Sequence, residues 1–517
     1  MNQTQPGLRG LVDRAVEDFR VAGFVIEPEL LHRFVAALMT KRFVILTGQT
    51  GSGKTRLAQT FANWITQPSR SAADPFFAGA SIPSDRTTYL VHDADRMSIE
   101  FLNDPGPGAT RVVLPRRLVS EWAQAIISEG FGRETPARTI REFVAQKTRF
   151  SAQLNSFETH LKAAAFAEIM AQPAEDAPAT RAYRVVPVGA DWTTTEHILG
   201  YPDALDHGRY VRTPSLDLIL RAAANPAAPH FLILDEMNMS HVERYFSDML
   251  SAMESGEPIH LHTGETGAER DGVPSQIALP PNLFIVGTVN VDETTYLFSP
   301  KVLDRANTIE FRTHADQLSL FLGNPAALDV RSVAGKGRDF AGPFLYAATT
   351  QLTLENPARA MVEQELLLLV RVLEASGHEF GFRTAAEASR FVGAHLLLGG
   401  GPAGATRQAI MAAIDAQVYQ KILPRMNGTR GSLDAPLRSL RHLCESPHEW
   451  SDGPAPRLLN HDRLAAGAVQ AAAPRYAGIK EEPPPAGVAS AFPASLGKID
   501  RMLRALDHSG FASFAEA

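Results

Sequence analysis

A glycine-rich octapeptide constrains this chain more than any other feature, and it reads Gly48-Gln49-Thr50-Gly51-Ser52-Gly53-Lys54-Thr55. It fits the pattern G-x-x-x-x-G-K-[ST], follows an apolar run at 43–46 and precedes a helical run at 55–64. In such a strand, loop and helix, backbone N–H groups surround phosphate oxygens, Lys54 reaches the β- and γ-phosphates, and the Thr55 hydroxyl can bind Mg²⁺. The octapeptide therefore predicts a nucleoside triphosphate at the edge of a parallel α/β sheet. The alternative is a glycine-rich turn without a ligand.

A carboxylate pair, Asp235 and Glu236, directly follows a second apolar run at 231–234. An Asp at the carboxyl end of a buried strand lies in the crevice where open α/β sheets bind ligands, and it can hold the water shell of Mg²⁺. Glu236 can polarise an attacking water. The alternative is a solvated pair at a strand end. Together with the loop, the pair predicts a hydrolytic site that uses Mg²⁺.

The remaining periodicity predicts the organisation of the chain. Apolar runs at 185–188 and 283–288 add two strands, which makes four central strands in all. The glycine-containing stretch 258–281 predicts a surface hairpin or loop. The domains follow as a helical lead-in at 1–40, a nucleotide-binding core at 41–67 and 181–315, an inserted α+β module at 68–180, a helical lid at 316–450, and a proline-rich linker with a last helix at 451–517.

Charge and cysteine content exclude several classes of protein. The 50 Lys and Arg against 57 Asp and Glu give a net charge of −7, so any nucleic-acid contact requires a local basic patch. Cys444 is the single cysteine, which excludes an internal disulfide framework and suits a reducing compartment. No apolar run approaches the ~20 residues of a membrane span, and the first 20 residues lack a signal-peptide core. We expect a cytoplasmic protein without a membrane partner.

The inserted module is the first candidate for substrate recognition. Between 111 and 149 it carries eight Lys and Arg against four acidic residues, a local excess that could lie against the phosphates of double-stranded DNA. A solvated helical face or a subunit contact is the alternative. Its aromatic residues fall at helical spacing, which favours core packing over base stacking. His260 and His262 alternate without a third ligand, so a metal site is not expected there.

Several segments together resemble the AAA+ ATPases, and in particular the McrB-like and dynein-related branch that includes the MoxR-like proteins. They are the glycine-rich loop, the Asp235-Glu236-Met237-Asn238 run, Gly287-Thr288-Val289-Asn290, Phe298-Ser299-Pro300-Lys301, Leu303-Asp304-Arg305 and Phe380-Gly381-Phe382-Arg383-Thr384. The resemblance implies an AAA+ fold, with a three-layer parallel sheet and a C-terminal all-α lid, in which subunits assemble into a ring, expected to be a hexamer.

The resemblance also implies roles for three residues. Asn290 would be the sensor of the γ-phosphate or the attacking water, or else a strand-end cap. Arg305 would act as an arginine finger on the nucleotide of a neighbouring subunit. Its alternative is a surface Arg paired with Asp304 or Asp292. Arg383 would be the sensor of the lid domain, or else an Arg packed within the helical bundle.

By the same resemblance, the ring would use nucleotide hydrolysis to drive a separate McrC-like nuclease in restriction of foreign DNA. The Met-Asn-x-x-Asp signature of McrB proper, linked to guanine selectivity, is absent, since Val289 precedes Asn290 and Val291-Asp292-Glu293 follows it. ATP is therefore the expected cofactor, with GTP as the alternative. Two other functions stay open: a MoxR-like chaperone ATPase that remodels a protein without touching DNA, and a nucleotide-gated scaffold with negligible turnover.

Overall fold

The chain divides into two compact units, Met1–Gln67 with Ala182–Ala517, and Pro68–Arg181. The computed structural model describes residues 7–66, 181–206, 208–263, 268–291, 298–313, 328–401, 405–445, 490 and 492–515. It also describes a few positions between 315 and 322 and three strands between 89 and 115. These strands, β2 (Tyr89–Asp93), β3 (Ser98–Leu102) and β4 (Arg111–Pro115), form an antiparallel sheet in the second unit. The helices expected in the insertion and most of the proline-rich segment lie outside the described residues.

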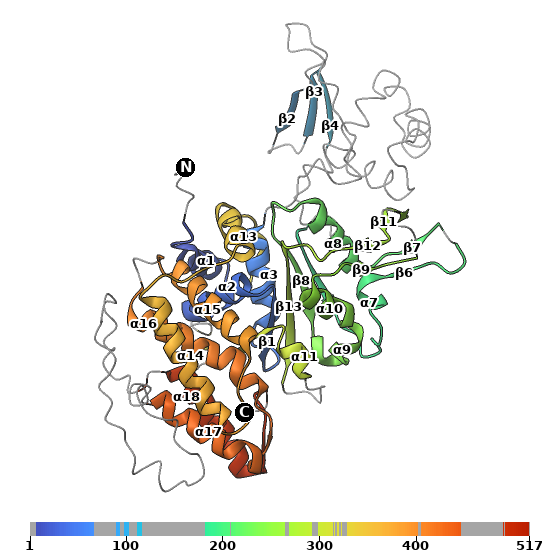
Figure 1. The fold of residues 1–517 in the computed structure, drawn as a ribbon. Coiled ribbons are helices and arrows are strands. Elements are labelled where there is room, and N and C mark those ends of the chain that lie inside the picture. Colours follow the sequence, from blue (N-terminus) through green and yellow to red (C-terminus); the bar gives the residue numbers. More distant parts are fainter. Residues whose placement is uncertain are drawn as a thin grey trace, which may run out of the picture. The chain divides into compact units, whose positions relative to one another are not determined.

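The first unit is built on a five-stranded parallel sheet with the strand order β14-β1-β13-β8-β5 (Figure 1). The strands are β1 (Phe43–Gly48), β5 (Tyr183–Pro187), β8 (His230–Asp235), β13 (Leu283–Asn290) and β14 (Asn307–Phe311). All pairings are parallel, so the carboxyl ends of the strands lie together along one side of the sheet, the carboxyl edge. Their amino ends lie along the opposite side, the amino edge. The predicted α/β class with a helix-flanked parallel sheet is confirmed.

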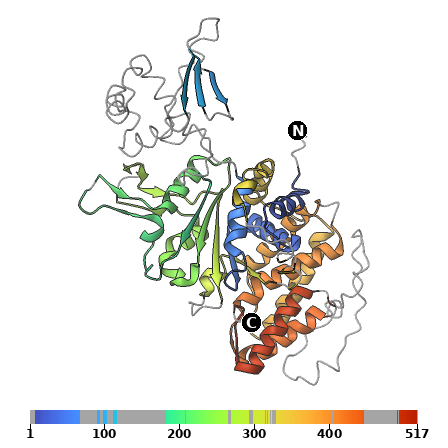
Figure 2. The ribbon, with the colours of Figure 1, turned by 180° about the vertical axis from the view of Figure 1, so that it is seen from behind.

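Both faces of the sheet are buried, which explains why its strands read as continuous apolar runs rather than as alternating ones. Val44 and Leu46 belong to one hydrophobic core, whereas Phe43 and Ile45 belong to the other. Figure 2 shows helices on each side of the sheet. On one side are α1 (Leu11–Val21), α2 (Pro28–Thr40) and α3 (Lys54–Ile65), and on the other are α7 (Glu196–Leu199), α8 (Pro214–Ala224), α9 (Val242–Tyr245) and α10 (Ser247–Ser255).

Short β-hairpins lie on the side of the sheet that carries α7–α10. One pairs β6 (Tyr201–Pro202) with β7 (Tyr210–Val211). The hairpin expected at 258–281 contains two ladders, β9 (Ile259–His260) with β12 (Gln276–Ile277), and β10 (Glu269–Arg270) with β11 (Val273–Pro274). The His262 ring lies 3.0 Å from the carbonyl oxygen of Val273, so this histidine bonds to backbone. No group of three or more metal-ligating side chains exists among the described residues.

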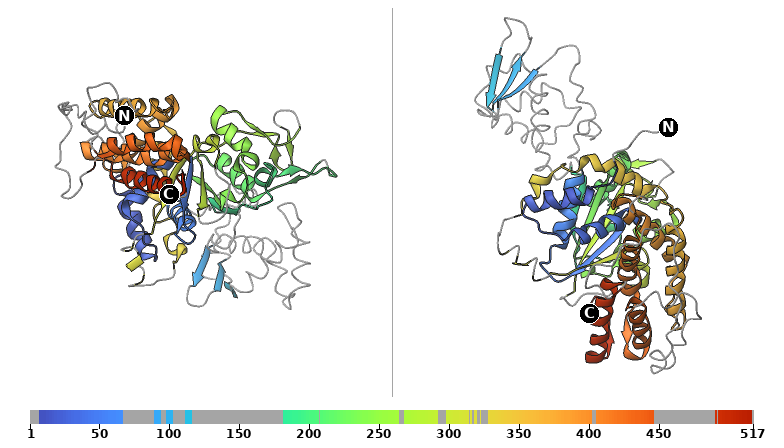
Figure 3. Two further views of the ribbon diagram at one scale, coloured as in Figure 1. Left: turned by 90° about the horizontal axis from the view of Figure 1, so that it is seen from below. Right: turned by 90° about the vertical axis from the view of Figure 1, so that its left-hand side faces the viewer.

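The C-terminal part is helical and shares one hydrophobic core with α1–α3. Its elements are α13 (Ala341–Thr349), α14 (Ala358–Glu374), α15 (Phe382–Leu398), α16 (Arg407–Gln417), the π-helical turn η7 (Val418–Ile422), the 3₁₀ turn η8 (Leu423–Arg425), α17 (Arg430–Glu445) and α18 (Pro493–Ser509). Strands β15 (Gly428–Thr429) and β16 (Phe511–Ala512) pair beside α17 and α18, which pack against each other (Figure 3). No helix in the described part of the chain is both long and apolar enough to cross a bilayer.

The fifth strand of the parallel sheet, β14, was not predicted from the sequence. Its residues include Asn307, Thr308 and Glu310, which break the apolar run that marks the other strands. Asn307 and Thr308 are nevertheless buried, because β14 lies at the edge of the sheet beside β1 and is covered by η7. Tertiary burial, rather than local propensity, determines this strand.

Candidate active site

The glycine-rich loop connects the carboxyl end of β1 to the first residue of α3. Gly51 and Gly53 have φ values of 78° and 97°, a region that glycine adopts without strain. Gly48 has a second constraint, because a Cβ atom there would lie 2.4 Å from the carbonyl oxygen of Phe311 on β14. The loop thus opens a helix whose free N–H groups face the crevice at the strand ends, the arrangement that binds phosphate.

Lys54 folds back over this loop and is only 4% exposed. Its Nζ donates hydrogen bonds to the carbonyl oxygens of Gly48 at 2.8 Å and Gln49 at 2.7 Å. It also lies 3.4 Å from the Ser52 hydroxyl. The ammonium group is therefore held within the loop, where it can exchange carbonyl contacts for phosphate oxygens.

The predicted metal residues, Thr55 and Asp235, are in direct contact. Thr55 Oγ1 donates a hydrogen bond of 2.6 Å to Asp235 Oδ1, joining the first turn of α3 to the end of β8. Thr288, on the neighbouring strand β13, donates a second hydrogen bond of 2.6 Å to the same carboxylate oxygen. Two hydroxyl groups from different elements therefore fix the orientation of the Asp235 carboxylate.

The two hard oxygens fit a Mg²⁺ ion that takes its other ligands from water and phosphate. Mg²⁺ is usually held in proteins by one or two side-chain oxygens together with waters and substrate phosphates. Thr55 and Asp235 would hold the ion, and its chemistry is to neutralise charge on the phosphates.

Glu236, the candidate base, has a left-handed backbone conformation with φ of 55°. This conformation is uncommon for residues with a side chain and clusters at functional sites. The Glu236 N–H donates to the Thr288 hydroxyl at 3.1 Å, and its Oε1 accepts a hydrogen bond of 3.3 Å from Nδ2 of Asn290. The candidate base and the candidate sensor are thus brought together at the carboxyl edge.

The backbone beside this pair is closely packed. Gly287 on β13 lies against Met237, and a Cβ atom at position 287 would come within 2.3 Å of the Met237 sulfur. The Tyr245 hydroxyl donates a hydrogen bond of 2.7 Å to the Met237 carbonyl oxygen. Burial raises the pKa of Tyr245 well above its usual value, so this hydroxyl stays protonated and holds the turn after Glu236.

Arg305 lies at the amino edge of the sheet, whereas the glycine-rich loop lies at the carboxyl edge. It precedes β14, in which Asn307 is level with Val44 and Phe311 is level with Gly48. Its guanidinium forms an ion pair with Glu254 and donates to the carbonyl oxygens of Leu250 and Lys301, at 3.0 and 2.7 Å. The alternative pairing with Asp304 does not occur, because the Asp304 carboxylate faces Arg425 at 3.4 Å. Asp292 lies outside the described residues.

Arg383, in the first turn of α15, also pairs with Glu254, and one of its contacts is 3.1 Å long. Its side chain is 48% exposed, so it is not packed within the helical bundle. The structure therefore places both candidate arginines together at the amino edge, on one carboxylate. Within a single chain, neither arginine lies at the glycine-rich loop.

Two residues of this arrangement had no predicted role, Thr288 and Glu254. Thr288 lies two residues before Asn290 on the same strand, so its side chain lies on the same face, a signal that strand alternation offers. Glu254 had no such signal, since its partners are 51 and 129 residues away in the chain.

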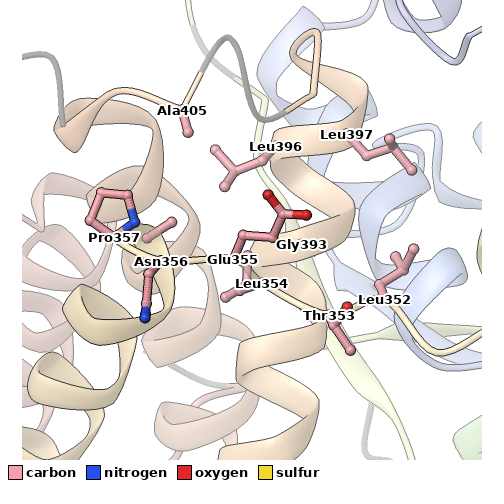
Figure 4. A pocket seen from close by; sticks show the side chains of 11 residues that line it. Leu352, Thr353, Leu354, Glu355, Asn356, Pro357, Gly393, Leu396, Leu397 and Ala405 are labelled. Atoms are coloured by element: carbon pink, nitrogen blue, oxygen red, sulfur yellow. The ribbon is translucent and has the colours of Figure 1, made fainter. Parts of the chain in front are cut away.

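A separate cavity of about 200 Å³ lies between the start of α14 and the side of α15 (Figure 4). Apolar residues such as Leu352, Leu354 and Leu396 line much of it, and Glu355 supplies a carboxylate. The phosphate loop and the Asp235 region contribute no residue to its wall. This cavity is therefore distinct from the candidate active site.

Comparison with known proteins adds a family for part of the chain and a distant structural likeness. Residues 343–511 match a family described as a domain of unknown function, DUF8727, which spans α13 to β16. A solved structure of a candidate ATPase from Cytophaga hutchinsonii ATCC 33406 is similar at 12% sequence identity and a TM-score of 0.32. That similarity covers 47% of this chain and 68% of the other. No curated protein matches the sequence.

Proposed function

We propose that this protein is a Mg²⁺-dependent nucleoside triphosphatase of the AAA+ type, using ATP or else GTP. The observation that carries the proposal is the contact between Thr55 and Asp235 beside the Glu236–Asn290 pair. Lys54 and the loop N–H groups would bind the phosphates. Glu236 would accept a proton from the attacking water, and Asn290 would orient that water or the γ-phosphate.

The position of Arg305 supports an active site that is completed between subunits. Five residues of β14 separate it from the level of Gly48, roughly 15 Å at the rise of a strand. The Arg305 side chain is also turned toward Glu254 and away from the carboxyl edge. If Arg305 stabilises the transition state, we expect it to do so on the nucleotide of a neighbouring copy, as in the proposed ring, expected to be a hexamer.

The finer proposal is that this ring resembles McrB and drives a separate McrC-like nuclease on double-stranded DNA. The nuclease partner and the DNA substrate rest on the sequence resemblance described above.

The test is turnover of ATP and GTP by the purified protein, with and without double-stranded DNA and the candidate nuclease. We expect Mg²⁺-dependent hydrolysis that DNA and nuclease together stimulate. Glu236→Gln should abolish hydrolysis while nucleotide binding persists, and Lys54→Ala should weaken binding itself. An absence of Mg²⁺-dependent turnover would refute the hydrolase, whereas stimulation by a protein partner alone, without DNA, would favour the chaperone function.

A further inference from the structure

A buried lysine from the C-terminal helices holds the backbone on both sides of Arg305. Lys421 is 1% exposed, and its Nζ donates hydrogen bonds to the carbonyl oxygens of Leu303, Asp304 and Ala306, at 3.3, 2.7 and 2.9 Å. These carbonyls belong to residues directly before and after Arg305. One side chain therefore fixes the peptide segment that carries the candidate finger.

The carbonyl groups of this segment favour a nearby positive charge. The segment follows the short helix α11 (Pro300–Leu303), and the last carbonyls of a helix have no partners within the helix. A cation at that end is also favoured by the helix dipole. Lys41, just before β1, adds a hydrogen bond of 2.6 Å to the Asp304 carbonyl oxygen. Buried cations are costly unless they are paired and bonded, and these two are both.

The two lysines share a carboxylate, Glu387 on α15. Lys421 lies 2.9 Å from Glu387 Oε2, and Lys41 bonds to the other oxygen. Lys421 itself lies in the π-helical turn η7, a rare backbone form that is often found at functional sites. Lys41 and Lys421, from segments far apart in the sequence, thus both bond to residues 303–306, and Glu387 on α15 links the two lysines.

We propose that Lys421 is a positioning residue that sets the location of Arg305 for its neighbour's nucleotide. It thereby couples the C-terminal helices to the active site of the adjacent subunit. This inference rests on the proposed ring function. The Arg305 side chain pairs with Glu254, while Lys421 bonds to the backbone on both sides of Arg305, so we expect a shift of η7 to displace the guanidinium.

The predicted consequence is a defect that appears in the neighbouring subunit rather than in the altered one. Lys421→Met removes the ammonium group but keeps the aliphatic length. We expect turnover to fall about 10- to 100-fold, because small misplacements of a catalytic group have effects of that size. Nucleotide affinity should not change, since Lys421 does not contact the loop. Lys421→Arg, which can donate to several carbonyls, should recover part of the activity.

Mixed rings provide the decisive measurement. Glu236→Gln subunits cannot hydrolyse at their own site but carry an intact Arg305, whereas Arg305→Ala subunits have the reverse defect. Mixing Lys421→Met with Glu236→Gln should restore turnover, and mixing it with Arg305→Ala should not. Lys498→Met is the matched control. That lysine is also fully buried, but its ion pair is with Glu310 on β14, at 3.0 Å.

The outcomes separate the two proposals. If Arg305→Ala is restored by Glu236→Gln and Lys421→Met is not, the positioning role is wrong while the ring function stands. If Glu236→Gln restores turnover to neither Arg305→Ala nor Lys421→Met, Arg305 does not act on a neighbouring subunit. The positioning role proposed for Lys421 is then wrong as well. Where Lys421→Met does not fold, by circular dichroism and gel filtration, Lys421→Gln enters the same mixtures with the same expected results.

Discussion

The two edges of the parallel sheet are built in different ways. At the carboxyl edge, Thr55, Asp235, Glu236 and Asn290 each follow or end a short motif, and they meet through hydrogen bonds within one chain. At the amino edge, Arg305 and Arg383 meet on Glu254, which belongs to a third element. The first edge gathers all the groups proposed to bind phosphate and Mg²⁺, whereas the second holds Arg305, whose proposed partner is the nucleotide of another subunit.

The difference shows what positions the side chains at each edge. The carboxyl edge relies on backbone geometry, since glycines and a left-handed Glu236 shape the loop and the turn. The amino edge relies on buried charge, since Lys41, Lys421 and Glu387 are gathered from distant segments. Backbone geometry depends little on pH, whereas buried charge depends on it strongly. The comparison can therefore be tested with pH as well as with substitutions.

The largest expected effect is on the pH dependence of stability at the amino edge. Burial, and then the neighbouring Lys421 charge, lower the pKa of Lys41 to about 7, while Glu387 opposes the shift. Above that pH the folded protein has lost a proton that the unfolded chain keeps up to about 10.5. Stability therefore rises with pH across this window, by about 2.7 kcal/mol between pH 6 and 9.

Urea denaturation at pH 6, 7, 8 and 9 measures this rise. Lys41→Met should lack it, because the group that titrates is gone. The buried Lys498, whose pKa is lowered to about 8, contributes in the same direction, so the difference between wild type and variant isolates Lys41. Lys301→Met, at an exposed lysine of α11, should keep the wild-type slope. If the free energy of unfolding of Lys41→Met rose with pH as steeply as that of the wild type, titration of Lys41 would not be the cause of the rise.

Much of the fold and of the carboxyl edge could be predicted from the sequence. The apolar runs that became β1, β5, β8 and β13 are buried on both faces, so they are visible without long-range information. The octapeptide also encodes a local conformation in its glycines, and this places Lys54 and Thr55. Strand β14 could not be predicted, because Asn307 and Thr308 become buried only through contacts with β1 and η7.

At the carboxyl edge, the sharpest substitution is Thr288→Val, which keeps the shape and removes one hydroxyl. That hydroxyl donates to Asp235 and accepts from the Glu236 N–H. Without it, the half-buried Asp235 carboxylate and a backbone donor each lose a partner, a loss of about 2 kcal/mol. We expect turnover to fall about 30-fold with nucleotide affinity little changed, measured by steady-state kinetics and equilibrium binding.

Two further variants define what that result means. Thr288→Ser retains the hydroxyl and should recover most of the turnover. Thr308→Val alters a threonine that is equally buried, but in β14, and should leave turnover near wild type. If Thr288→Val kept turnover within twofold of wild type, the hydrogen bonds seen at this edge would not govern the reaction.

The amino edge could not have been predicted in the same way. Arg305 and Arg383 are named by the resemblance, but their meeting on Glu254 depends on how α10 and α15 pack against the segment before β14. The same holds for Lys421, whose three carbonyl partners lie more than a hundred residues earlier in the chain. Partners at such separations leave no periodic pattern in the sequence. Only the tertiary structure reveals them.

The smallest expected effect belongs to Glu254 itself. Its carboxylate is 33% exposed, and partly exposed ion pairs contribute little energy, so the two arginines are held only weakly. Phosphates of a nucleotide bound to a neighbouring subunit would compete with Glu254 for the Arg305 guanidinium. Glu254→Gln removes that competition, and we expect turnover of the ring to rise, by less than about fivefold.

Salt provides the internal check on this interpretation. High ionic strength already weakens the Glu254 pairs in the wild type, so the advantage of Glu254→Gln should shrink as salt is raised. Glu257→Gln, at an exposed carboxylate three residues along the chain, is the matched control and should not change turnover. A fall in turnover in Glu254→Gln, comparable to that of Arg305→Ala, would instead show that Glu254 orients the arginines. The arginine side chains at the amino edge would then be oriented within the single chain, before subunits assemble, as the side chains at the carboxyl edge are.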